Sequence, residues 1–76
     1  MATTGRDTAV DEIRDARAAR DELRAALAEV DVRLPSLGID LVSLASPHLT
    51  LLVDLGRCRP DVARRLAEAL RAGRNA

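Results

Sequence analysis

The stretch LVSLASPHLTLLVDLG, residues 41–56, decides the fold, because aliphatic side chains stand on both sides of a turn signal. The segments IDLVSL, residues 39–44, and LTLLVDL, residues 49–55, flank this signal and are rich in residues that favour β-structure. Between them lies ASPHL, residues 45–49. The pattern predicts an antiparallel β-hairpin.

The turn sets the expected register of the hairpin. With Pro47 second in a turn over residues 46–49, Leu44 pairs with Leu51 and Val42 with Val53. One face of the hairpin is then the more apolar, with Val42, Leu44, Leu51, Val53 and Leu55. The other face carries Leu41, Ser43, Thr50, Leu52 and Asp54. A shift of register by one residue would exchange the two faces.

A long helix is expected before the hairpin, over residues 9–30, which contain Ala, Leu, Arg and Glu without Gly or Pro. Thr8 is the expected N-cap, and Pro35 and Gly38 end the helical stretch. One side of this helix has heptad spacing and reads Ile13, Ala16, Arg20, Leu23, Leu27 and Val30. The seam fits either an amphipathic helix on its own sheet or a short coiled coil.

A second helix follows the hairpin in PDVARRLAEALRAG, residues 60–73. Pro60 suits the first helical position, and Gly73 suits a stop. Asp61 and Arg65 form an expected ion pair one turn apart. Val62, Leu66, Ala69 and Leu70 form the apolar side of this helix.

The chain is therefore expected to form a single α+β domain of α-β-β-α order over residues 9–73. Residues 1–8 form a flexible tail, and residues 74–76 fray. The antiparallel hairpin is packed by the two helices and completed by dimerisation, because an isolated two-stranded sheet is marginal and has two exposed edges.

Homodimerisation is also favoured by the thin core that 76 residues without Phe, Tyr or Trp can build. Leu41 and Leu52, on the second face of the hairpin, are the candidate interface residues. Arg20 is a third, since an Arg in an apolar seam either reaches solvent along its stem or meets an acid from a partner.

The composition indicates where the protein works. All 12 basic residues are Arg, which indicates a high-GC bacterial genome, and they balance 12 acidic residues. One cysteine, no apolar N-terminal segment and no long apolar run together predict a cytoplasmic protein without membrane contact.

No arrangement of residues predicts catalysis, a metal or a cofactor. His48 is expected in a solvated turn, and Cys58 either packs at the helix start or is a reactive thiol between two Arg. Asp40 and Asp54 are expected on opposite faces of the hairpin, which excludes a carboxylate pair. A chain of 76 residues also leaves no room for a pocket of ~300 Å³. We therefore expect no enzyme.

Two function classes remain. The first is a small interaction module, a homodimeric adaptor or regulatory accessory protein that docks on a larger, unidentified protein. The alternative is a nucleic-acid-binding regulator, because residues 56–76 hold six Arg against two acids. Its candidate contacts are Arg57, Arg59, Arg64, Arg65 and Arg71. The balanced total charge and the missing aromatic residues argue against this alternative.

Overall fold

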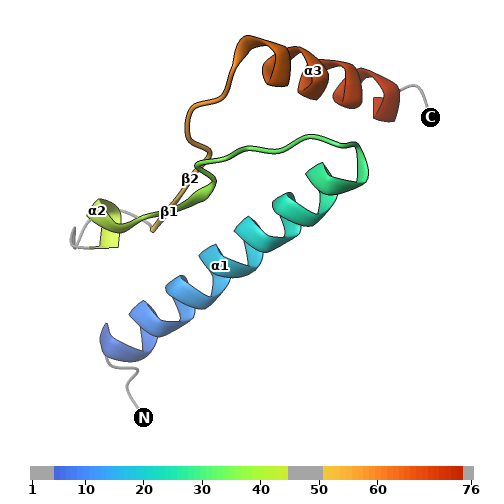
Figure 1. The fold of residues 1–76 in the computed structure, drawn as a ribbon. Helices are drawn as coiled ribbons and strands as arrows, with labels where there is room; N and C mark the ends of the chain where they lie inside the picture. Colours follow the sequence, from blue (N-terminus) through green and yellow to red (C-terminus); the bar gives the residue numbers. More distant parts are fainter. Residues whose placement is uncertain (1–4, 45–50, 75–76) are drawn as a thin grey trace.

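A computed structural model describes residues 5–44 and 51–74 and confirms the α-β-β-α order with an antiparallel hairpin (Figure 1). It adds one short helix between the strands. The elements are α1 (Gly5–Glu29), β1 (Gly38–Asp40), α2 (Leu41–Leu44), β2 (Leu52–Asp54) and α3 (Pro60–Arg74).

Helix α1 begins earlier than expected, at Gly5, so that Thr8 lies inside the helix and is not its N-cap. The predicted apolar seam is confirmed over most of its length: Ala16 and Leu27 are buried, and Ile13 and Leu23 are half-buried. The seam is no longer buried at Val30, which is 47% exposed.

The end of α1 is fixed by backbone hydrogen bonds. The amide of Val32 donates to the carbonyl of Leu27 at 2.9 Å, and the amide of Asp31 donates to the carbonyl of Ala28 at 3.2 Å. These bonds form a Schellman motif, with Asp31 in the left-handed conformation at φ 58°. The buried side chains of Leu27 and Val32 belong to one cluster, which supplies the apolar contact typical of this motif.

The predicted strand register is wrong. Val53 pairs with Ile39, not with Val42, and the flanking pairs are Gly38 with Asp54 and Asp40 with Leu52. The physical reason is α2: residues 41–44 leave the extended conformation directly after Asp40 and form a helical turn. The expected turn over residues 46–49 lies outside the described residues.

The new register changes which side chains face inward. Ile39 and Val53 share the face that α1 covers, and Val53 packs against the core cluster. Leu51 is buried as expected, but Val42 and Leu55 are 80% and 53% exposed and do not belong to the inner face.

The core centres on Leu27, Val32 and Leu37, which come from the end of α1 and the segment before β1. The side chains packed against it are Leu23, Leu34, Val53, Val62 and Leu66. Helix α3 therefore joins the core through its first two turns. It continues past Gly73 to Arg74, so Gly73 is not a helix stop.

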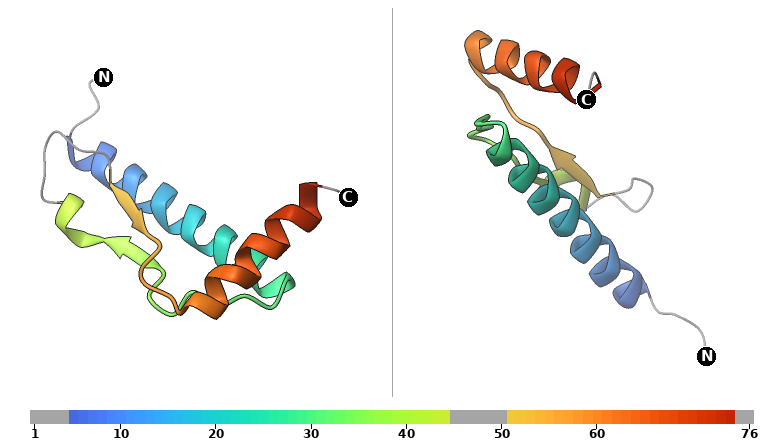
Figure 2. Two further views of the ribbon diagram at one scale, coloured as in Figure 1. Left: turned by 90° about the horizontal axis from the view of Figure 1, so that it is seen from above. Right: turned by 90° about the vertical axis from the view of Figure 1, so that its right-hand side faces the viewer.

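The molecule is extended. Figure 2 shows α1 running along the hairpin, while α3 lies apart from the strands near the C-terminal end of α1. The radius of gyration is 15.5 Å, against about 11 Å for a compact domain of this length. The accessible surface of 6420 Å² exceeds by about 1,900 Å² that of a typical monomer of this mass.

Candidate interaction surface

The face of the hairpin turned away from α1 carries Asp40, Leu52 and Asp54, and we name these three residues the outer hairpin face. Leu52 is 48% exposed between two carboxylates. The expectation that Asp40 and Asp54 point to opposite faces is wrong, because the observed register pairs them with Leu52 and Gly38 on one face. An apolar side chain with an acidic border results.

Backbone amides hold both carboxylates in place. Oδ1 of Asp40 accepts a hydrogen bond from the amide of Val42 at 3.0 Å and so caps α2. Oδ1 of Asp54 accepts one from the amide of Gly56 at 2.8 Å. In the described part of the chain, the acids that form ion pairs are Asp21 and Asp61, and neither Asp40 nor Asp54 is among them. The negative charge therefore stays at the surface.

Ser43 joins α2 to β2. Its hydroxyl donates to the carbonyl of Asp40 at 2.6 Å and accepts from the amide of Leu52 at 2.9 Å. The side chain is buried, at 4% exposure, and both of its hydrogen bonds are to backbone. The sequence signal for this arrangement is an Asp followed three residues later by a Ser, a spacing suited to a local cap.

Gly56 is a second residue that the sequence reading missed. Its backbone has φ 74°, and a Cβ there would lie 2.5 Å from the Cβ of Ser36. Only glycine allows the chain leaving β2 to pass this close to the segment before β1. The close approach fixes where the connection to α3 starts.

Helix α3 carries the second exposed apolar surface. Ala63, Ala67, Leu70 and Arg74 recur at four- and three-residue spacing, and we name them the α3 outer face. Leu70 is 67% exposed, and no residue of α3 is buried. Since Val62 and Leu66 supply its core contacts, the second half of α3 has an apolar side that its own chain leaves in solvent.

The five Arg proposed for nucleic acid are all exposed but do not form one stripe. Arg64 and Arg71 lie seven residues apart and share a side of α3, whereas Arg65 points about 100° away. Arg57 and Arg59 precede the helix. Nε of Arg59 lies 3.3 Å from Oδ1 of Asp61, which takes the place of the expected pair between Asp61 and Arg65.

Arg20 and Leu41 were the other interface candidates. The Arg20 side chain is 25% exposed, and its Nη2 lies 3.0 Å from Oδ1 of Asp21. Its charge is therefore paired within its own chain. Leu41 is the first residue of α2, and its side chain lies outside the described part of the structure.

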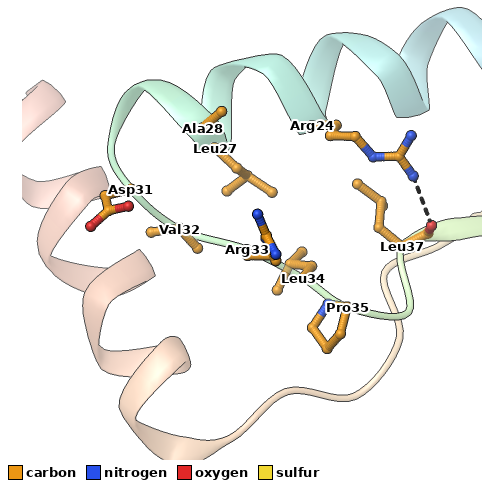
Figure 3. A pocket seen from close by; sticks show the side chains of 9 residues that line it. All are labelled: Arg24, Leu27, Ala28, Asp31, Val32, Arg33, Leu34, Pro35 and Leu37. Atoms are coloured by element: carbon orange, nitrogen blue, oxygen red, sulfur yellow. Dashed lines mark hydrogen bonds between the residues drawn. The ribbon is translucent and has the colours of Figure 1, made fainter.

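A pocket of about 590 Å³ lies beside the end of α1, so the expectation that the chain has no room for one is wrong (Figure 3). Its lining includes the core residues Leu27, Val32 and Leu37 and two Arg, Arg24 and Arg33. Nη2 of Arg24 donates to the carbonyl of Leu37 at 3.2 Å, which ties α1 to the segment before β1. The lining consists of aliphatic side chains, two Arg and a single carboxylate, and it contains no Ser, Cys or His.

Cys58 is an exposed thiol, and His48 lies outside the described residues. Over residues 5–44 and 51–74, no three His, Cys, Asp or Glu side chains are placed to hold a metal ion. Within the same ranges, none of the helices combines the length and the apolar character needed to cross a membrane.

Comparisons with known proteins gave no match to a protein-family model, to a curated protein or to a solved structure.

Proposed function

We propose that the chain is a small interaction module that forms a homodimer and, as a dimer, docks on a larger protein as an adaptor or regulatory accessory subunit. The Arg-only basic composition and the single Cys support the cytoplasm of a high-GC bacterium as its setting. The proposal includes no catalytic step.

The observation that carries the proposal is the excess of accessible surface. The chain exposes about 1,900 Å² more surface than a typical monomer of its mass. If a partner covers that area, the accessible surface per chain becomes typical of a compact monomer. Permanent dimers bury about 2,000–5,000 Å² in total, which is about 1,000–2,500 Å² per chain. The excess falls within this range.

The exposed side chains include large apolar ones, which a dimer interface of this size requires. Among the described residues, Val42, Leu52, Leu55 and Leu70 are all about half exposed or more, on the hairpin side and on α3. The buried hydrophobic residues of the described chain are few: Ala16, Leu27, Val32, Leu37 and Leu51. Burial of further aliphatic area therefore contributes a large share of the stability available to this molecule.

The test is size-exclusion chromatography with light scattering and refractive-index detection, in a reducing buffer so that Cys58 forms no disulfide between chains. Absorbance at 260 nm is recorded on the same run, because the chain has no Trp or Tyr to absorb strongly. We expect the mass of a dimer, twice 8.2 kDa, without a 260 nm signal. A monomer mass at every concentration would contradict the proposal.

The same run tests the alternative function, nucleic-acid binding by Arg57, Arg59, Arg64, Arg65 and Arg71. Strong absorbance at 260 nm that disappears in high salt would support this alternative, because phosphate contacts weaken steeply as salt rises. The scattered placement of these Arg, two before α3 and three that do not share one side of it, favours the interaction module.

A further inference from the structure

We propose that the outer hairpin face of each protomer is covered by the α3 outer face of a second copy. This inference rests on the proposed homodimer and specifies its geometry. Each hairpin then forms the middle layer between its own α1 and the partner's α3. The same pair of surfaces is used twice, once in each direction, which closes a two-fold symmetric dimer.

The apolar parts of the two surfaces match. Leu52 is 48% exposed and Leu70 is 67% exposed, and each is the large apolar side chain of its surface. Small residues, Ala63 and Ala67, adjoin Leu70 on α3 and allow close approach to a strand. Packing Leu70 of one copy against Leu52 of the other removes both side chains from water.

Charge decides which surfaces pair. Two outer hairpin faces in contact would bring the carboxylates of Asp40 and Asp54 from both copies together. Two α3 outer faces would gather the guanidinium groups of Arg74 and of Arg71, which follows Leu70 at the border of this face. Like charges facing each other across an interface are unfavourable. The hairpin against α3 is the pairing that sets acids opposite bases.

The chain itself leaves both surfaces available. Helix α1 packs on both strands from the inner side, and α3 reaches the core with Val62 and Leu66, ahead of Leu70. In both views of Figure 2, α3 lies beside the end of α1 and not over the strands. An added helix would cover the outer side of the hairpin, which α1 leaves exposed.

Disulfide trapping tests the geometry. In a Cys58→Ser background, a tagged Leu52→Cys protein is mixed with an untagged Leu70→Cys protein and oxidised. We expect a tagged-untagged disulfide dimer that forms at least about tenfold faster than with Val30→Cys in place of Leu52→Cys, because a disulfide requires Cα atoms about 4.4–6.8 Å apart. Val30 is a matched control, since it is 47% exposed and Leu52 is 48% exposed.

A charge cycle tests the same contact without new cysteines. Asn at positions 40 and 54 keeps an oxygen for the backbone amides of Val42 and Gly56 but removes the negative charge. We expect Asp40→Asn with Asp54→Asn, and separately Arg71→Gln with Arg74→Gln, to raise the dimer Kd about tenfold each. The four changes together should raise it no further than one pair alone, because each pair removes the same attraction.

The outcomes separate the inference from the proposed function. A dimer in which Leu52→Cys cross-links to itself, or in which Val30→Cys cross-links as fast, overturns this geometry and leaves the homodimer intact. Independent effects of the two charge pairs on Kd overturn it as well. A wild-type chain that stays monomeric overturns both. Circular dichroism at 222 nm on every variant separates loss of pairing from loss of folding.

Discussion

Gly56 shows how one residue fixes the path of the chain. Alanine there would hold φ 74° and place its Cβ 2.5 Å from the Cβ of Ser36. We expect Gly56→Ala to lower the free energy of unfolding by about 2–4 kcal/mol, from left-handed strain and overpacking combined. Urea unfolding followed by circular dichroism measures this loss, and a loss below about 1 kcal/mol would contradict the close approach.

Gly73 is the matched control for that experiment. It lies inside α3, and a Cβ there would meet no heavy atom within 4 Å. Gly73→Ala should therefore raise the free energy of unfolding by up to about 1 kcal/mol, because alanine is the better helix former. The two Gly→Ala changes should shift the urea midpoint in opposite directions.

Ser43 is expected to be the most sensitive polar residue of the described core. Ser43→Ala leaves the amide of Leu52 and the carbonyl of Asp40 without their partner in a site that is 4% exposed. We expect the free energy of unfolding, measured by thermal unfolding, to fall by about 1–3 kcal/mol. Ser36→Ala, which changes an exposed hydroxyl in the same region, should cost less than about 0.5 kcal/mol. Equal losses would mean that the Ser43 hydroxyl has no special role.

At the scale of elements, the residue that ends α1 has an unfavourable backbone conformation, which a substitution can relieve. Asp31 holds a left-handed conformation at the position where helices favour glycine. Asp31→Gly should raise the free energy of unfolding by about 0.5–1 kcal/mol, seen as a rise in Tm of about 2–8 °C. Asp31→Val should lower Tm instead, because a β-branched residue tolerates this conformation least. A fall in Tm for both variants would contradict the Schellman geometry.

The elements also show what the sequence could predict. Helix periodicity in α1 identified the buried positions Ala16 and Leu27, because a 25-residue helix repeats its signal many times. Each strand has three residues, too few for alternation to fix a register, so the assumed turn at Pro47 set it incorrectly. The deciding interactions were the local hydrogen bonds of Asp40 and Ser43.

The candidate interaction surface was harder to predict than the fold. Leu52 was recognised as a candidate, since any register that buries Val53 exposes its neighbour. Leu70 was assigned to the packed side of the last helix, and its 67% exposure depends on where α3 leaves the core. The connection to α3 starts at the close approach of Gly56 to Ser36, residues 20 apart in the chain, and local sequence patterns do not reveal such a contact.

At the scale of the whole molecule, stability should depend on protein concentration. A dimer that covers the excess surface gains stability by mass action, so we expect Tm to rise as concentration increases. Wild-type protein unfolded over a hundredfold range of concentration checks this. The variant with Asp40→Asn and Asp54→Asn should show the rise only at higher concentration. A constant Tm for wild type would indicate a monomer.

The connection between β2 and α3 has a consequence for the life of the protein in a cell. Residues 55–59 are all exposed and include Arg57, which is a cleavage site for trypsin-like proteases. In the proposed dimer this segment is tied at both ends, by the hairpin and by an α3 docked on another copy. In a protomer without a partner the second half of α3 is undocked, and we expect the chain to be cut here first. Degradation would then depend on concentration: monomers, which predominate when the protein is scarce, are degraded, and dimers, which predominate when it is abundant, persist.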